Sequence, residues 1–330
     1  MWRISGHMNS VRLLDQARVA GRLASGYLLC GPAQIGKRAV ALELAKALNC
    51  LSSSPPCGLC DQCRRIDAGS HPDVRILEVS EIDNRRMISI DVVRDVSRQV
   101  LIRPFQGQWR VTVIDGAESL SDEAANALLK ILEEPPPQVL FILLTTNSMR
   151  VLDTIRSRCQ NLFLRPLSNE SVYKILVGQW GVDDEEAKKL SLLSQGRMGW
   201  AIRCVNDKSV LDRQLRRINE LLSISRAPLE ERFAHAGELA GLFLKDPFSI
   251  WEVLDLWIFL WRDVLIAKVG PPELTGGSYG MDHVEEWASQ YTIEDLIRVI
   301  RSLMGVKNLL EANVNPRLAL EGLALSIPQV

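Results

Sequence analysis

Apolar residues form two patterns along this chain. Residues 27–30, 110–115 and 139–144 are short apolar or β-branched runs, as expected of strands buried in a parallel sheet. Residues 39–48 and 117–134 carry apolar side chains at helical spacing and follow two of these runs. The alternation predicts an α/β domain with a parallel sheet.

The pattern predicts three regions. Residues 1–165 are expected to form the α/β domain, residues 166–207 a small helical lid, and residues 208–330 an all-α bundle suited to an oligomerisation collar. Ser168 is a suitable N-cap for the first lid helix. Helical periodicity in the collar region is clearest in residues 211–222, 250–267 and 293–310, and an amphipathic helix is also predicted at residues 89–103.

Charge and hydropathy narrow the function classes. The 330 residues carry a net charge of -1, so no global attraction to nucleic acid or membrane is implied. The first residues contain no apolar signal core. The most apolar stretch is interrupted by Asp255, Arg262 and Asp263, too soon for a membrane span of about 20 residues. A cytoplasmic protein without membrane contact is predicted.

A phosphate-binding loop motif follows the first predicted strand. Residues 31–38 read Gly-Pro-Ala-Gln-Ile-Gly-Lys-Arg and match G-x-x-x-x-G-K through Lys37. Gly31 and Gly36 let backbone N–H groups face phosphate oxygens, and the helix that follows adds partial positive charge at its N-terminus. Lys37 would reach the terminal phosphates. The motif predicts the fold of a P-loop ATPase.

Two groups that ATP hydrolysis requires are missing. Arg38 stands where hydrolysing loops carry the Ser or Thr that holds Mg²⁺. Asp115 suits the carboxylate that holds the metal's water shell, but Gly116 follows it in place of a Glu base. Thr146 follows the next strand, at the edge where parallel sheets bind ligands. We therefore predict a degenerate nucleotide site formed by Gly31, Gly36, Lys37, Arg38, Asp115 and Thr146.

Four cysteines follow the phosphate-loop helix with the spacing C-x6-C-x2-C-x2-C. Cys50, Cys57, Cys60 and Cys63 could surround one Zn²⁺ with four thiolates, which closes the tetrahedron and makes the site structural. The segment, about residues 49–72, has too little apolar content to fold alone, so metal would supply its ordering energy. An iron–sulfur cluster is the alternative for the same ligands. A stand-alone zinc module for nucleic acid has little support, because only Arg64 and Arg65 are basic neighbours.

Further motifs occur in a fixed order. They are Asn-Ala-Leu-Leu-Lys at 126–130, Leu-Glu-Glu-Pro-Pro at 132–136, Thr-Thr-Asn at 145–147 and Ser-Arg-Cys at 157–159. With the cysteine insertion, this order resembles the bacterial DNA polymerase III clamp-loader subunits of the AAA+ class. The resemblance covers roughly the first 200 residues, and residues 313–321 more weakly resemble the closing helix of the loader's collar domain.

Three departures separate the chain from the ATP-hydrolysing gamma/tau subunits of that family. Arg38 and Gly116 replace two catalytic residues. In residues 196–201, the flanking Gly and Ala align Gly199 with the sensor-2 arginine, although a register shifted by two would bring Arg197 into the site. The combination resembles the delta-prime subunits, which implies a non-hydrolysing subunit that holds the geometry of a ring.

The resemblance also implies partners and a role for Arg158. This arginine of the Ser-Arg-Cys motif would act as an arginine finger on the ATP of a neighbouring subunit. The implied partners are gamma/tau and delta subunits in a hetero-oligomeric ring and, through the complex, the sliding clamp and primed DNA. The alternative is an active gamma/tau-like ATPase that uses Lys37, Asp115 and Glu118. Nucleotide binding without turnover stays open, because Lys37 and the loop glycines are present.

Overall fold

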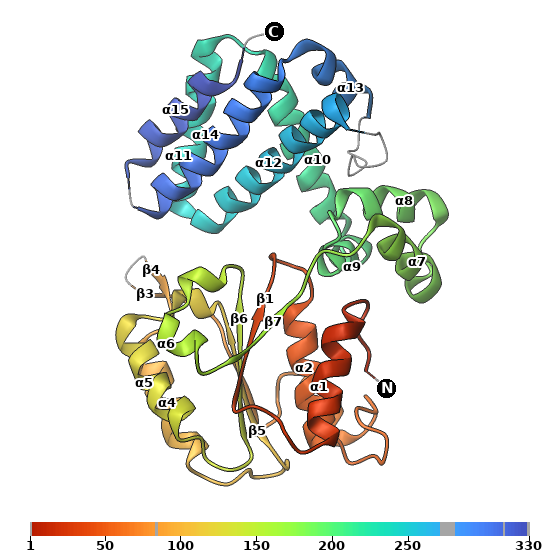
Figure 1. Cartoon of the computed structure of the whole chain (residues 1–330), viewed down its shortest axis with the longest axis vertical. Coiled ribbons are helices and arrows are strands. Elements are labelled where there is room, and N and C mark those ends of the chain that lie inside the picture. Colours follow the sequence, from red (N-terminus) through yellow and green to blue (C-terminus); the bar gives the residue numbers. More distant parts are fainter. Residues whose placement is uncertain (1, 83–84, 271–280, 313, 329–330) are drawn as a thin grey trace. The chain divides into compact units, whose positions relative to one another are not determined.

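The computed structural model of this chain describes residues 2–82, 85–270, 281–312 and 314–328. It divides into two compact units, each described by itself below (Figure 1). The first unit comprises Met1–Gln179 with Gly196–Trp200, and the second comprises Trp180–Gln195 with Ala201–Val330. The finer division into nucleotide-binding, lid and collar domains stays a prediction.

The first unit is built on a five-stranded parallel sheet, which confirms the predicted α/β class. The strand order is β2-β5-β6-β1-β7. Because β6 lies between β1 and β5, the loops that follow these three strands meet at the carboxyl edge of the sheet. The strands are β1 (Gly26–Cys30), β2 (Val74–Leu77), β5 (Arg110–Asp115), β6 (Val139–Thr145) and β7 (Gln160–Phe163).

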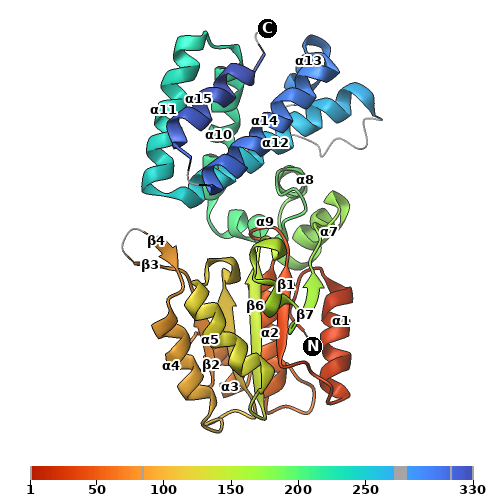
Figure 2. The same ribbon diagram turned by 60° about the vertical axis from the view of Figure 1, so that its left-hand side comes forward.

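Both faces of this sheet are covered by helices, as Figures 1 and 2 show. Successive side chains of β6 point to opposite faces, and all seven of its residues are buried. Phe141 and Leu143 pack in the core formed with α4 (Ile90–Val100), α5 (Asp122–Glu133) and α6 (Asp153–Arg156). Ile142 and Leu144 pack in the core formed with α1 (Met8–Val19) and α2 (Lys37–Asn49). Burial on both faces explains why the strand reads as a continuous apolar run.

The remaining elements of the first unit are short helices and one hairpin. Strands β3 (Ser80–Ile82) and β4 (Arg85–Met87) pair antiparallel to form the hairpin. The helices are α1 (Met8–Val19), α2 (Lys37–Asn49), α3 (Asp61–Asp67), α4 (Ile90–Val100), α5 (Asp122–Glu133), α6 (Asp153–Arg156) and α7 (Asn169–Trp180), with 3-10 turns η1 (Ala117–Ser119) and η2 (Ser148–Arg150).

One predicted helix is interrupted. The segment 117–134 begins with the turn η1, and the α-helix α5 starts only at Asp122. Ser121 is the reason, because its backbone is extended and its hydroxyl accepts a hydrogen bond from the N–H of Ala124 at 3.1 Å. The prediction of one continuous helix was therefore wrong at its start. The predicted helix at 89–103 is confirmed as the shorter α4, with Ser89 as its N-cap residue.

The second unit is helical throughout its described part, as its apolar periodicity predicts. Predicted segments 211–222, 250–267 and 293–310 each lie inside one helix. None of the helices in the described ranges is long and apolar enough to cross a membrane. The helices are α8 (Asp184–Leu193), α9 (Met198–Asn206), α10 (Lys208–Arg226), α11 (Leu229–Lys245), α12 (Pro247–Val269), α13 (Met281–Gln290), α14 (Ile293–Glu311) and α15 (Pro316–Ser326), of which α9 begins in the first unit.

Aromatic side chains and one buried arginine organise this bundle. The rings of Trp261 in α12 and Trp287 in α13 stack with centroids 4.8 Å apart, and Tyr291 meets Trp261 edge-on at 5.3 Å. Arg232 of α11 is buried and donates to the carbonyls of Ala227 at 2.8 Å and Ile327 at 2.5 Å. The guanidinium thus satisfies carbonyls that follow α10 and α15.

Candidate functional site

The phosphate loop lies between β1 and α2, at the carboxyl edge of the sheet. Gly36 has φ of 116°, a conformation that L side chains rarely adopt. A Cβ at Gly31 would lie 2.5 Å from the carbonyl oxygen of Leu164, so a side chain is excluded there. Both glycines are therefore required by the backbone of the loop itself.

Lys37 is turned onto its own loop. Its ammonium donates to the carbonyl oxygens of Gly31 at 2.6 Å and Pro32 at 2.9 Å, and the residue is 8% exposed. Burial lowers the pKa of Lys37, while the nearby carboxylates of Glu118 and Asp115 act in the opposite direction. In this arrangement the loop's own carbonyls hold two of the three ammonium protons.

Arg38 brings a guanidinium close to Asp115, the carboxylate at the end of β5. It forms an ion pair with Glu78, which follows β2, and its Nη1 lies 3.9 Å from Oδ2 of Asp115. Burial raises the pKa of Asp115, and the positive charges of Arg38 and Lys37 oppose that rise. The place beside Asp115 that a divalent cation would need thus holds a fixed positive charge.

Gly116 has no side chain that could act as the base expected after Asp115, and the carboxylate of Glu118 is held by hydrogen bonds. Gly116 has φ of 91°, and a Cβ there would lie 2.8 Å from Cγ2 of Val79. Glu118 lies in η1, and its Oε1 accepts from the N–H of Thr146 at 3.1 Å and from its hydroxyl at 2.7 Å. The carboxylate of Glu118 therefore ties the loop after β6 to the turn after β5.

The backbone at Gly199 lies directly on the phosphate loop. A Cβ at Gly199 would lie 2.5 Å from the carbonyl oxygen of Gln34, and the N–H of Trp200 donates to that oxygen at 3.1 Å. No side chain fits at this position. Arg197 instead lies over the ring of Trp200, with its Cζ 6.0 Å from the ring centroid.

One contact to the phosphate loop could not be predicted from the sequence motifs. The Nε2 of His7, just before α1, lies 3.0 Å from the carbonyl oxygen of Ile35. Nε2 donates this hydrogen bond, because a carbonyl oxygen can only accept, and burial lowers the pKa of His7. His7 has φ of 55°, which turns the chain sharply where α1 begins. Only the tertiary structure brings this residue to the loop, because 28 residues separate the partners.

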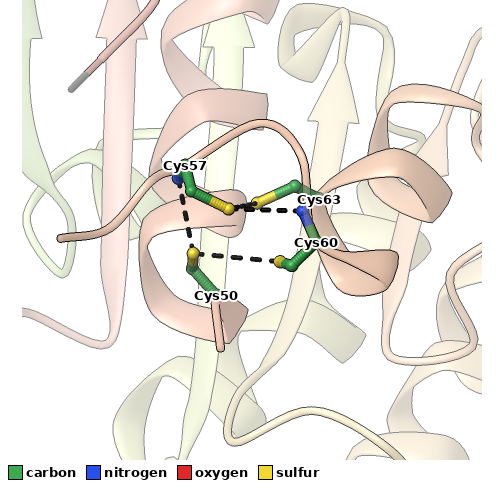
Figure 3. Close-up of side chains that lie close together, drawn as sticks. All are labelled: Cys50, Cys57, Cys60 and Cys63. Atoms are coloured by element: carbon green, nitrogen blue, oxygen red, sulfur yellow. Dashed lines mark hydrogen bonds between the residues drawn. The ribbon is translucent and has the colours of Figure 1, made fainter. Parts of the chain in front are cut away.

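The four predicted cysteine ligands form one cluster. Figure 3 shows their side chains turned toward one another, and all four sulfurs lie within 4.8 Å of each other. The Sγ atoms of Cys50 and Cys60 are 3.9 Å apart, and those of Cys57 and Cys63 are 4.0 Å apart. Four Zn–S bonds of about 2.3 Å at tetrahedral angles place sulfurs about 3.8 Å apart. The cluster therefore fits one zinc ion, and its separations exclude disulfides.

Backbone N–H groups point at two of these sulfurs. The N–H groups of Ser52 and Cys57 each lie 3.4 Å from Sγ of Cys50. Those of Leu59 and Cys60 lie 3.4 and 3.3 Å from Sγ of Cys57, and they lower the pKa of Cys57 to about 6. Such donors favour the thiolate form, which is the form that binds metal.

Buried polar contacts attach the cysteine segment to the α/β core. Lys46 of α2 is 5% exposed and pairs with Glu43 and, at 2.8 Å, with Asp67 at the end of α3. His71 lies outside the cluster, where its Nδ1 accepts from the N–H of Asp73 at 3.0 Å and its Nε2 bonds the side chain of Gln62. His71 thus holds the loop before β2.

Arg158 lies at the opposite edge of the sheet from the phosphate loop. Gln160 of β7 pairs with Tyr27 of the parallel strand β1. Arg158, two residues before Gln160, therefore lies at the same height along the sheet as Ser25, which precedes Gly31 by six residues. At about 3.3 Å per residue the two levels are about 20 Å apart along the strands. The guanidinium pairs with Glu133 at 2.5 Å and donates to the carbonyl of Thr154 at 3.0 Å, and its side chain is 36% exposed.

The chain is similar to several known proteins. A family model described as "DNA polymerase III, delta subunit" matches residues 6–168. The DNA polymerase III subunit delta' of Bacillus subtilis is 27% identical over 320 residues, 97% of this chain and 95% of its own length. The subunit tau of Escherichia coli is 39% identical over 171 residues, 51% of this chain but 26% of tau. A solved gamma subunit-related protein from Thermotoga maritima covers 95% of this chain and 98% of its own, at 19% identity and a TM-score of 0.44.

Proposed function

This chain belongs to the DNA polymerase III clamp-loader family, and on that premise we propose that it is a non-hydrolysing, delta-prime-type subunit. In this role it completes the ring of subunits that opens the sliding clamp and places it on primed DNA. The observation that carries the proposal is the pairing of Arg38 with Glu78 and Asp115 beside the phosphate loop.

Two features argue against ATP hydrolysis: a positive charge where Mg²⁺ would bind, and the lack of suitably placed side chains around the phosphates. Phosphoryl transfer relies on Mg²⁺ to neutralise charge on the phosphates, and a guanidinium beside Asp115 repels that cation. Gly116 offers no carboxylate to orient water, and Glu118 is held by Thr146. At Gly199 the loop itself leaves no room for a side chain that could reach a phosphate.

An active gamma/tau-like ATPase is the second candidate. The 39% identity to tau over 171 residues favours it, as does the retention of Lys37 in a loop with the correct strand and helix on either side. Hydrolysis would require Lys37 to leave its two loop carbonyls, Arg38 to leave Asp115, and Glu118 to leave Thr146. These combined rearrangements make the non-hydrolysing function the better supported one.

We further propose that Arg158 acts in trans on the ATP of a neighbouring subunit. About 20 Å of strand separates its level from its own phosphate loop, so it cannot serve that loop in cis. Its side chain is partly exposed beside the edge strand β7, where another subunit can approach. A guanidinium suits this role because its planar fork matches phosphate oxygens in two places at once.

For the cysteine cluster we propose a structural zinc ion. Four sulfurs at tetrahedral separations leave no open position for substrate or water, so the ion would order the segment rather than catalyse. It would hold residues 50–63 together at the end of α2, where Lys46 and Asp67 attach the same segment to the core.

Two measurements test the proposed function. The full chain should copurify with gamma/tau and delta subunits when they are coexpressed, and alone it should show no ATP turnover above the background of Lys37→Ala. Arg38→Thr should not restore turnover, because Gly116 and the contact at Gly199 remain. Steady-state hydrolysis by the purified chain that disappears in Lys37→Ala would establish the gamma/tau-like alternative, and failure to copurify would reject a place in the ring.

A further inference from the structure

Residues 2–7, which precede α1, connect the cysteine cluster to the phosphate loop. We call this segment the strap. Near its start Arg3 contacts the backbone of the cysteine segment, and at its end His7 contacts Ile35 of the phosphate loop. Because Arg3 and His7 are close in the chain, a displacement of one end of the strap reaches the other through few rotatable bonds.

The Arg3 side chain lies on the backbone between two of the cysteine ligands. A Cβ at Gly58 would lie 2.7 Å from Cζ and 2.9 Å from Nε of Arg3, so the guanidinium lies against this glycine. Its Nη2 donates to the carbonyl oxygen of Cys57 at 3.5 Å. Gly58 has φ of 68° and stands between Cys57 and Cys60. The surface that receives Arg3 is therefore positioned by two residues that would bind the metal.

The charge of a bound metal acts in the same direction. A zinc ion held by four thiolates has a net negative charge, because the thiolates carry more charge than the ion. The guanidinium of Arg3 is a cation beside Cys57. Metal binding therefore favours the docked position of Arg3, by an amount that screening by solvent reduces.

A second route leads from the cysteine segment to the strap through buried charges. The backbone N–H of Arg3 donates to Oε2 of Glu43 at 2.8 Å, and Glu43 is 4% exposed. Glu43 pairs with Lys46, which also pairs with Asp67 at the end of α3. The carboxylate that receives the strap is thus held by the same lysine that attaches the cysteine segment.

The loop end of the strap depends on the ring of His7. Its Nε2 donates to the carbonyl oxygen of Ile35 at 3.0 Å. A Cβ at Gly36 would lie 3.9 Å from both Nε2 and Cδ2 of this ring. The ring therefore lies beside the peptide that directly precedes Lys37. Loss of the contact would remove a donor from the Ile35 carbonyl and loosen the backbone that positions Lys37.

We infer that the strap is a metal-dependent link between the two sites: zinc at the cysteine cluster fixes Arg3, and the strap then holds the phosphate loop through His7. The inference rests on the proposed zinc ion. It gives the cysteine segment a role beyond its own folding, because loss of the metal would loosen the phosphate loop at Ile35 without touching any residue of that loop directly.

Nuclear magnetic resonance of the full chain tests this link with two readouts that do not depend on activity. One is hydrogen exchange of the amide at position 3, which donates to Glu43. The other is the pKa of His7, which burial lowers in the docked strap. In the zinc-loaded wild type the amide should be protected and the pKa of His7 should lie below its ordinary value.

Three variants separate the link from general destabilisation. Arg3→Ala should keep the zinc but raise the exchange rate at position 3 about threefold or more, as expected for one lost hydrogen bond. It should also move the pKa of His7 up toward about 6.5. Cys63→Ser, which removes a metal ligand, should produce larger changes in both readouts. The matched control Arg12→Ala, at an exposed position of α1, should change neither.

The outcomes are distinguishable. If Arg3→Ala keeps the wild-type exchange rate and the wild-type pKa of His7, the link fails while the zinc assignment stands. Faster exchange at position 3 with an unchanged pKa of His7 also overturns it, because the strap would then not control the phosphate loop. Metal-free wild-type protein rejects the zinc ion and the link together. The delta-prime-type function fails separately, through the copurification experiment, which does not depend on the strap.

Discussion

Single side chains are the basis for the proposal that this chain does not hydrolyse ATP. Arg38 differs from Ser or Thr by a long cationic side chain, and that side chain reaches Glu78 and Asp115. At Gly116 and Gly199 the side chain is missing altogether, and at both positions a neighbouring group occupies the place where a Cβ would lie. Packing around the loop therefore leaves no room for a side chain at Gly116 or Gly199. We expect that replacing only one of the three residues would not restore ATP hydrolysis.

At the same scale, Arg158→Ala should leave the chain folded and able to join the loader but should impair the assembled complex. An arginine finger contributes about 10³ to 10⁵ in rate in GTPases, so the ATPase site that Arg158 serves should lose at least about tenfold. Arg158→Lys should not restore it, because an ammonium lacks the planar fork. DNA-stimulated ATPase and clamp loading by the reconstituted complex provide the measurement.

The ion pair of Arg158 offers a matched control. Glu133→Ala removes the partner carboxylate while keeping the guanidinium. If Arg158 serves only to hold Glu133, both variants should have the same effect on the loader. If it serves a neighbour's ATP, only the change at Arg158 should lower turnover. Full activity in the complex that contains Arg158→Ala would show that the residue is an ordinary surface charge.

At the scale of elements, the segment from Cys50 to the end of α3 buries few large apolar side chains that could order it. Cys63 and Ile66 are buried, whereas Leu51 and Leu59 are 69% and 64% exposed. The polar attachments through Lys46 and the convergence of four sulfurs account for the described fold of the segment. We therefore expect the stability of this segment to depend on a metal ion held by the sulfurs.

We predict that the purified chain contains one zinc ion and that Cys63→Ser loses it. Because metal binding supplies folding energy to such segments, loss of the ion should cost about 2 kcal/mol or more and lower the melting temperature by about 4–8 °C. Elemental analysis and thermal unfolding measure both effects. Cys159→Ala, which removes a buried cysteine outside the cluster, should keep the zinc content unchanged. An iron chromophore, or metal-free protein that unfolds like the wild type, would reject the assignment.

At the scale of the whole molecule, the chain combines a sheet-based unit and a helical unit with separate sources of stability. The first unit is held by two apolar cores on the two faces of the sheet. The second depends on aromatic packing between α12 and α13 and on Arg232, which joins α11 to the ends of α10 and α15. Substitutions in the helical unit should therefore leave the cysteine cluster of the sheet-based unit intact.

Arg232→Met tests this separation. The change keeps the apolar stem but leaves the carbonyls of Ser225, Ala227 and Ile327 without their buried donor. Each unsatisfied buried group costs about 1–3 kcal/mol, so the unfolding free energy of the helical unit should fall by about 3 kcal/mol. The exposed Arg298→Met should change it little. Calorimetry with zinc analysis would contradict the prediction if Arg232→Met had no effect or released the metal.

Local patterns in the sequence were sufficient to predict the α/β class, the helical second unit and the four cysteines that form the cluster. Apolar periodicity reports burial within one element, and the motifs around Lys37 and the four cysteines depend on spacing within about a dozen residues. The start of α5 escaped this approach, because the capping hydrogen bond of Ser121 interrupts a stretch that is apolar at helical spacing throughout.

Only the tertiary structure decided which distant groups the residues around the phosphate loop contact. Arg38 meets Glu78 across 40 positions, Trp200 meets Gln34 across a far longer separation, and His7 reaches Ile35 from before the first helix. The sheet order also places Arg158 about 20 Å of strand away from its own loop. Such contacts follow from the order of strands and the packing of distant segments, and no spacing along the chain encodes them.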